Sequence, residues 1–191
     1  MQTSIKRYEV EIEGDAVVWN VMKRELEEER KGIKKDQLVE WEEENWRRKA
    51  EFNSKGEVII PTRWLHSTLI NACMKTRIVP HFATTKTNTY TNYVGAFRIE
   101  NNGSPVCKEK DLEPFGCYEP AQGKKGGGKV WRVRPMKRGW KTKFIVTDPE
   151  GRMLKKELQT LLDYAGLYIG IGDARVRQFG RFEVKSIKEV K

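Results

Sequence analysis

Residues 152–165, RMLKKELQTLLDYA, carry the clearest helical pattern in the chain. Their leucines recur at the spacing that gathers apolar side chains on one helix face, and Gly166 follows where such a helix usually ends. Segments with strand-like patterns lie on both sides of it, before residue 149 and after residue 166. A helix enclosed by strands in this way favours an α+β fold.

The rest of the chain extends this alternation of strands and helices. Residues 5–12 alternate apolar and polar side chains, which predicts a first strand that ends at Gly14 and Asp15. The apolar spacing after Pro61 predicts a helix from Thr62 to about Lys75. Further strands are expected at 58–60, 88–100, 129–135, 140–148, 167–172 and 181–187. The order predicts a ferredoxin-like, antiparallel βαββαβ sheet with helices on one face.

A chain of 191 residues is expected to form one domain, here with two excursions from it. Residues 17–52 mix runs of Glu with runs of Lys and Arg, which indicates a charged helical insertion with a solvated surface. Residues 103–128 contain several prolines and the sequence GKKGGGK, which predicts a long loop. That loop leads into the two basic strands, and together they form a predicted basic loop and hairpin at 103–147.

The segment from 120 to 147 contains no acidic side chain. Its Lys and Arg residues are interleaved with Trp131, Trp140 and Phe144, a combination suited to phosphates and stacked bases. The candidate nucleic-acid-binding residues are Lys124, Lys125, Lys129, Arg132, Arg134, Lys137, Arg138, Trp140 and Lys141, with Trp131 as a second candidate for stacking. The alternative is a solvated basic hairpin whose aromatic side chains belong to the core.

A second candidate segment is GIGDARVRQFGRF, residues 170–182. Its glycines allow positive φ angles or the close approach of a ligand, and arginines bind phosphates and bases through two hydrogen bonds. The candidate residues here are Gly170, Gly172, Arg175, Arg177, Gly180 and Arg181. The alternative is a tight turn between two strands, with the arginines exposed on it.

The overall charge of +10 and the isoelectric point near 9.5 favour a polyanionic partner. Three cysteines without metal-ligand spacing and the lack of a carboxylate cluster predict no metal and no cofactor. The sequence shows neither a signal peptide nor an apolar run of membrane-spanning length, so a cytoplasmic protein that does not enter membranes is expected. His66 and His81 are the candidates for acid–base catalysis, although a lone helical histidine is more often structural.

The C-terminal order of helix, LYIGIG, DARVRQFGRF and closing strand resembles the RAMP superfamily of CRISPR proteins. The segment IIPTRWLHSTLINAC is similar to the part that leads into the first core helix of those proteins. The resemblance implies a ferredoxin-like domain that binds RNA through a glycine-rich loop, here at 170–181, and through a protruding basic hairpin, here at 124–143. The layout is also similar to that of uncharacterised bacteriophage proteins. The chain has no histidine near its N-terminus that matches the catalytic one of RAMP ribonucleases.

The leading hypothesis is a non-catalytic protein that binds single-stranded RNA or DNA and coats the strand as a homo-oligomer. A phage-encoded protein acting in the host cytoplasm, with a host defence or recombination protein as a further partner, fits this hypothesis. Two alternatives stay open. The first is an anti-defence, anti-CRISPR-like module whose basic face binds an acidic protein, and the second is a metal-independent endoribonuclease that uses His66 or His81.

Overall fold

A computed structural model gives the fold and describes residues 5–76, 94–100, 104–120 and 128–190. The central sheet has the strand order β4-β7-β1-β8, formed by β4 (Arg98–Glu100), β7 (Lys129–Asp148), β1 (Lys6–Val18) and β8 (Glu183–Val190). Every pair of neighbours is antiparallel. With α3 (Thr62–Thr76) after β1 and α5 (Lys155–Tyr164) after β7, the chain follows the expected ferredoxin-like order of elements. The predicted α+β class is confirmed.

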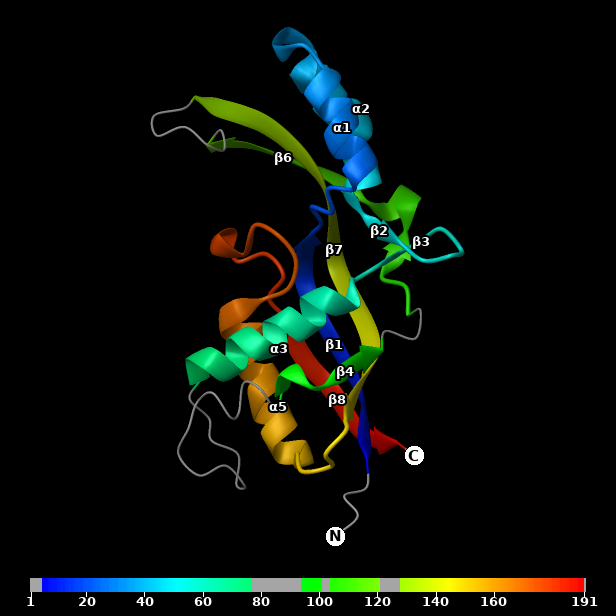
Figure 1. Cartoon of the computed structure of the whole chain (residues 1–191), viewed down its shortest axis with the longest axis vertical. Helices are drawn as coiled ribbons and strands as arrows, with labels where there is room; N and C mark the ends of the chain where they lie inside the picture. The colour runs from blue at the N-terminus through cyan, green and yellow to red at the C-terminus, as the bar shows by residue number, and fades with distance from the viewer. Residues whose placement is uncertain (1–4, 77–93, 101–103, 121–127, 191) are drawn as a thin grey trace.

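The core lies between this sheet and the two helices (Figure 1). Alternation along β1 places Tyr8, Val10 and Ile12 on the buried face and leaves glutamates on the other face. The helices cover the buried face with leucines that are almost fully buried, namely Leu65 and Leu69 of α3 and Leu158, Leu161 and Leu162 of α5. The open face carries paired charges, such as Glu11 with Lys143. None of the described helices is long and apolar enough to span a membrane.

The charged segment after β1 forms helices, as its composition predicts. It contains α1 (Arg24–Gly32), η1 (Lys35–Gln37), α2 (Leu38–Asn45) and η2 (Trp46–Lys49). The chain then forms a small sheet of β2 (Glu51–Phe52), β3 (Glu57–Ile59) and β5 (Cys107–Lys108). In Figure 1, α1 and α2 rise side by side beyond the end of the central sheet.

The predicted end of the first strand at Gly14 is wrong, because β1 continues to Val18. A Cβ at Gly14 would lie 2.1 Å from the Arg181 carbonyl oxygen and 2.8 Å from Trp140 Nε1. The glycine therefore permits close packing inside the strand and does not break it. Long pairing with β7, from Lys6↔Asp148 to Val18↔Met136, holds the whole of β1 extended.

The predicted hairpin between 129–135 and 140–148 is also wrong, because both segments belong to the single strand β7. Residues 136–138 continue the pairing with β1, and Gly139 takes a φ of +57° within the strand. The loop expected at 103–128 is wrong in part, since it contains β5, the short helix η3 (Glu109–Asp111) and β6 (Glu113–Pro120). The real hairpin consists of β6 and residues 129–136 of β7, and we call it the β6–β7 hairpin.

Two further strand predictions need correction. Residues 165–169 form η4 (Ala165–Ile169), a π-helical turn that continues α5, so the strand expected at 167–172 is absent. Gly166 therefore lies inside this turn, and Gly170, with a φ of +75°, follows its last residue. Of the strand expected at 88–100, residues 98–100 form β4 and 94–95 are helical, whereas 88–93 lie outside the described residues.

Candidate nucleic-acid interface

An aromatic pair with one exposed ring lies across the β6–β7 hairpin. Tyr118 and Trp131 are cross-strand partners, and their ring centroids are 4.9 Å apart. Tyr118 is 62% exposed and Trp131 is half-buried. A Cβ at Gly116 would come within 2.4 Å of the Trp131 ring, so this glycine allows the ring to lie against β6. The pair forms a surface on which bases can stack.

The basic side chains of the predicted segment differ in their surroundings. Lys129 is exposed on the same face of β7 as Trp131, because strand residues two apart share a face. Lys137 is half-buried, Lys141 is exposed, and Arg138 contacts Glu113 at 3.2 Å on the exposed surface. Lys124 and Lys125 lie outside the described residues. Lys129 therefore combines exposure with proximity to the aromatic pair.

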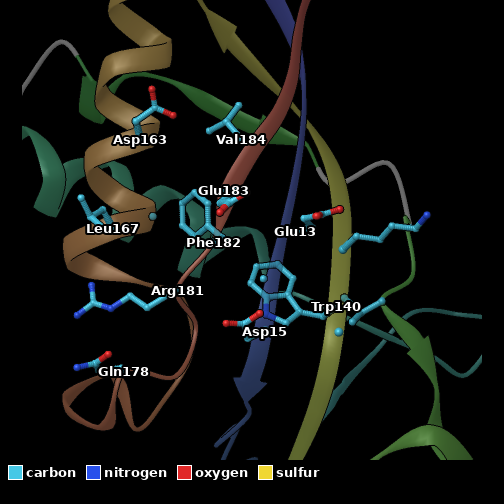
Figure 2. Close-up of a pocket in the computed structure, with 15 residues that line it drawn as sticks. Glu13, Asp15, Trp140, Asp163, Leu167, Gln178, Arg181, Phe182, Glu183 and Val184 are labelled. Atoms are coloured by element: carbon cyan, nitrogen blue, oxygen red, sulfur yellow. The ribbon is translucent and has the colours of Figure 1, made fainter.

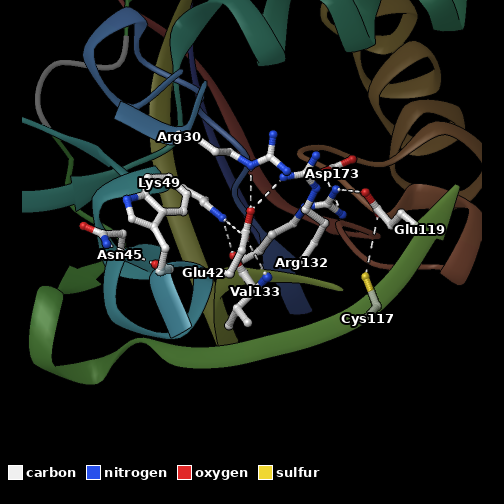
Figure 3. Close-up of polar contacts among 11 residues, drawn as sticks. Arg30, Glu42, Asn45, Lys49, Cys117, Glu119, Arg132, Val133 and Asp173 are labelled. Atoms are coloured by element: carbon white, nitrogen blue, oxygen red, sulfur yellow. Dashed lines mark hydrogen bonds and ion pairs between the residues drawn. The ribbon is translucent and has the colours of Figure 1, made fainter. Parts of the chain in front are cut away.

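Arg132 and Arg134 do not form the free basic face that alternation predicts. Arg132 Nη1 donates to Glu42 Oε1 at 2.7 Å. Arg134 is buried and contacts Glu119 Oε2 at 2.5 Å and Asp173 Oδ2 at 3.0 Å. Figure 3 shows Arg132 beside the Glu42 carboxylate. Both arginines are held in ion pairs within the protein, so the prediction that they bind phosphate is not supported by their position.

Glu42 is the centre of a buried polar cluster that joins α2 to β7 (Figure 3). The Glu42 carboxylate is fully buried and also accepts hydrogen bonds from Arg30, from Lys49 and from the Val133 backbone N–H. Lys49 is also buried and donates to the Val133 carbonyl oxygen at 2.8 Å. Glu42 and Lys49 thereby pair with the β7 backbone just beyond the end of β1, where a neighbouring strand is missing.

Burial raises the pKa of Glu42, but the hydrogen bonds from Lys49, Arg132 and Val133 outweigh it and bring this pKa below its ordinary value. Burial lowers the pKa of Lys49, and its contact with Glu42 offsets part of that effect. The carboxylate is therefore the better stabilised of the two charges. The cluster is a structural clamp that fixes the base of the β6–β7 hairpin.

Trp140 does not offer a surface for stacking. It is 1% exposed, and its ring packs edge-on against Phe182 at a centroid distance of 6.5 Å. Trp140 pairs with Gly14 on the helix-covered side of the sheet. The prediction of Trp140 as a base-binding residue is therefore corrected, and the exposed aromatic side chain of the hairpin is Tyr118. Sequence analysis missed Tyr118 because the prolines around it concealed the alternation of β6.

The glycines of segment 170–182 are explained by contacts within the chain. Gly170, Gly172 and Gly180 all have positive φ angles, and a Cβ at Gly180 would lie 1.7 Å from the Ile171 carbonyl oxygen. The segment is held by hydrogen bonds from Gly180 N–H to the Ala16 carbonyl and from Asp173 N–H to the Val18 carbonyl. These glycines shape the turn at η5 (Arg175–Arg177), where Arg175 and Arg177 are exposed. Arg181 is half-buried beside the start of β8.

The described histidine, His66, has surroundings that suit a structural role. Its Nε2 lies 3.2 Å from the Gly95 carbonyl oxygen, a contact that joins α3 to the segment before β4. His81 lies outside the described residues. Within the part of the chain that the structure describes, no group of three or more His, Cys, Asp or Glu side chains could hold a metal. The expectation of a non-catalytic protein stays a prediction.

Comparison with known proteins gives a likeness in structure. No family model and no curated protein matches the chain. A chain in the cryo-EM structure of the Type III-B Cmr-beta bound to cognate target RNA is similar in structure, with a TM-score of 0.57 and 12% sequence identity. The alignment covers 98% of this chain and 61% of that chain, so this protein spans about three fifths of its neighbour's length. The likeness agrees with the RAMP-type fold expected from the sequence and carries the fold alone.

Proposed function

We propose that this protein binds single-stranded nucleic acid along the β6–β7 hairpin. The observation that carries the proposal is the exposed Tyr118 ring, packed against the half-buried Trp131 beside Lys129, where β7 begins within a segment without acidic side chains from 120 to 147. Aromatic rings next to lysines let bases stack while the backbone phosphates meet positive charge. RNA is the first strand to test, because the structural neighbour is bound to target RNA.

The experiment is a fluorescence-anisotropy titration of nuclease-treated protein with matched single-stranded RNA, single-stranded DNA and duplex DNA. Wild type is expected to prefer a single-stranded probe. Tyr118→Ala is expected to weaken that binding by about 5- to 150-fold, because stacking contributes roughly 1–3 kcal/mol per base. The exposed position of Tyr118 means that its removal leaves the fold intact.

Tyr168→Ala is the matched control, since Tyr168 is 59% exposed on η4, outside the hairpin. Its affinity should equal that of wild type. Equal losses in both variants, or no loss in Tyr118→Ala, would overturn the assignment of the aromatic pair. Equal affinity for duplex and single strands would overturn the proposed substrate class.

A further inference from the structure

A pocket of about 950 Å³ opens beside the start of β8 (Figure 2). Asp163 and Leu167 enter it from α5 and η4, and Asp15 enters it from β1. Glu13 and Glu183 also line it and share Lys185, at 2.7 and 3.1 Å. Four carboxylates thus line a pocket that also contains Lys141 and Arg181.

Two exposed carboxylates of this pocket have no ion-pair partner among the described residues, and two buried hydrogen-bond donors, one of them Trp140 Nε1, have no acceptor there. Within the described ranges, Asp15 and Asp163 form no ion pair, and Asp163 accepts a hydrogen bond from the neutral amide of Gln159. The buried Nη1 of Arg181 has no hydrogen-bond partner there. Leu167, between them, is 63% exposed. The pocket therefore suits a ligand with two cations, an apolar side chain and a hydrogen-bond acceptor.

The turn at η5 presents two cations, an apolar side chain and hydrogen-bond acceptors on a fixed backbone. Val176 is fully exposed between Arg175 and Arg177, and its peptide carbonyls are acceptors. The residues on either side of the turn, Ala174 and Gln178, hold positive φ angles of 53° and 66° that are costly for side-chain-bearing residues. The two arginines form no ion pair with the described carboxylates, although Arg177 lies 5.7 Å from the Phe115 ring.

The acidic surroundings of the turn disfavour a phosphate backbone as its partner. A strand lying against Arg175 and Arg177 would also approach the unpaired carboxylates of Asp15 and Asp163, because Gln178 and Arg181 of the same segment line the pocket. Like charges placed together oppose binding, whereas a cationic peptide turn meets opposite charge. The charge pattern therefore favours a protein ligand at this place.

We infer that the Arg175–Val176–Arg177 turn of one copy of this chain docks in the acidic pocket of a second copy. The arginines face Asp15 and Asp163, Val176 packs on Leu167, and a carbonyl of the turn accepts from Arg181. Because turn and pocket are neighbours on the same surface, two copies can exchange turns about a two-fold axis. The result is a closed dimer.

The test measures molar mass by light scattering and sedimentation on the nuclease-treated full chain, without nucleic acid. Wild type is expected to be a dimer that dissociates as salt is raised. A turn variant, Arg175→Glu with Arg177→Glu, and a pocket variant, Asp15→Lys with Asp163→Lys, are each expected to raise the dimer dissociation constant at least about tenfold. An equimolar mixture of the two variants is expected to form a heterodimer, because each turn then meets a pocket of opposite charge.

The matched control is Lys34→Glu with Lys35→Glu, an equal change of charge on exposed residues far along the chain from both surfaces. The molar mass of this control variant should equal that of wild type at each salt concentration. A monomeric wild type, unaffected variants, or a mixture that stays monomeric would overturn the inference. A turn variant that loses nucleic-acid affinity while keeping its dimer mass would assign the turn to the nucleic acid. The nucleic-acid affinity of the pocket variant is measured separately. If that affinity equals the wild-type value while no dimer forms, the dimer inference fails and the proposed function stands.

Discussion

Glu42 contacts β7 at the point where the hairpin leaves the central sheet. Its carboxylate accepts from Lys49, Arg30, Arg132 and the Val133 N–H, and all of these contacts are formed where β1 no longer pairs with β7. Three cations around one buried anion make the cluster dependent on that single charge.

We expect Glu42→Gln to lower the free energy of unfolding by about 3–5 kcal/mol, because the buried Lys49 and the nearby arginines then lose their counter-charge. Urea denaturation followed by circular dichroism measures this loss. Glu43→Gln, at the next and exposed position of α2, is the control and should change stability little. Similar losses in the two variants would show that the cluster contributes little to stability.

The same cluster predicts a dependence of stability on acid. The pKa of Glu42 is lower in the folded protein than in the unfolded chain, so its contribution is present above the unfolded pKa and is lost as the pH falls through the folded value. The difference in stability between wild type and Glu42→Gln should therefore narrow below about pH 4.3. Urea midpoints across this range provide the measurement.

Residue patterns predicted the buried apolar positions of β1 and the leucines of α5, because these depend on local spacing. They failed for Arg132 and Arg134, because the carboxylates that neutralise them lie elsewhere in the chain. Glu42 is 90 positions from Arg132, and Asp173 comes from the segment after α5. Alternation shows which face a side chain occupies but not what packs against that face.

The segment between η4 and β8 is an element whose shape depends on glycine. Gly180 has a φ of +75°. The Ile171 carbonyl oxygen lies so close to Gly180 that a side chain at this position cannot fit. Gly180 also donates its N–H to the Ala16 carbonyl at 2.7 Å. The exposed turn is thus built on a base that only glycine permits.

Gly180→Ala is expected to destabilise the protein by about 2–5 kcal/mol, from the strained φ angle together with overpacking. Thermal unfolding measures the change. Gly32→Ala is the control, because a Cβ at that position meets no atom within 4 Å and the residue ends α1. A Gly180→Ala variant as stable as wild type would show that the segment rearranges without cost.

Elements were predicted well where periodicity was long, as in α3 and α5, and poorly where two periods compete. The apolar run 167–171 is compatible with a buried strand and with the end of a helix. In the structure α5 continues into the π-helical turn η4, so most of this run is helical. The sequence pattern indicated two strands, 129–135 and 140–148, yet the pairing of Ala16 with Arg138 and of Gly14 with Trp140 continues β7 between them. Tertiary pairing thus overrode the local signal.

The charge of the whole molecule is larger than the charge available to a ligand. Of the cations in the acid-free segment, Arg132 and Arg134 form internal ion pairs, and Arg138 and Lys143 contact surface carboxylates. Fewer cations are therefore free to contact phosphates, and the salt dependence of the proposed binding should be weaker than the net charge of +10 suggests.

For single-stranded RNA we expect the logarithm of the binding constant to fall with the logarithm of salt concentration with a slope of roughly −2 to −4, as for about three to five phosphates. Lys129→Gln should reduce the magnitude of this slope by about 0.7, since it removes one phosphate contact. Anisotropy titrations at several salt concentrations measure both values. Lys35→Gln, on the exposed surface of η1, should leave the slope unchanged, and a slope near zero would rule out phosphate contacts.

The twenty residues of β7 have a mechanical consequence. One backbone runs from the centre of the sheet, where β1 flanks it, into the hairpin, where β6 flanks it. A continuous strand thus joins the hairpin to the central sheet, and the Glu42 cluster contacts this strand at Arg132 and Val133, just beyond its pairing with β1. Ordering of the hairpin by a ligand is therefore expected to stabilise the neighbouring end of β1. Occupancy of the hairpin should thus slow amide hydrogen exchange at Val17 and Val18, far from any stacked base.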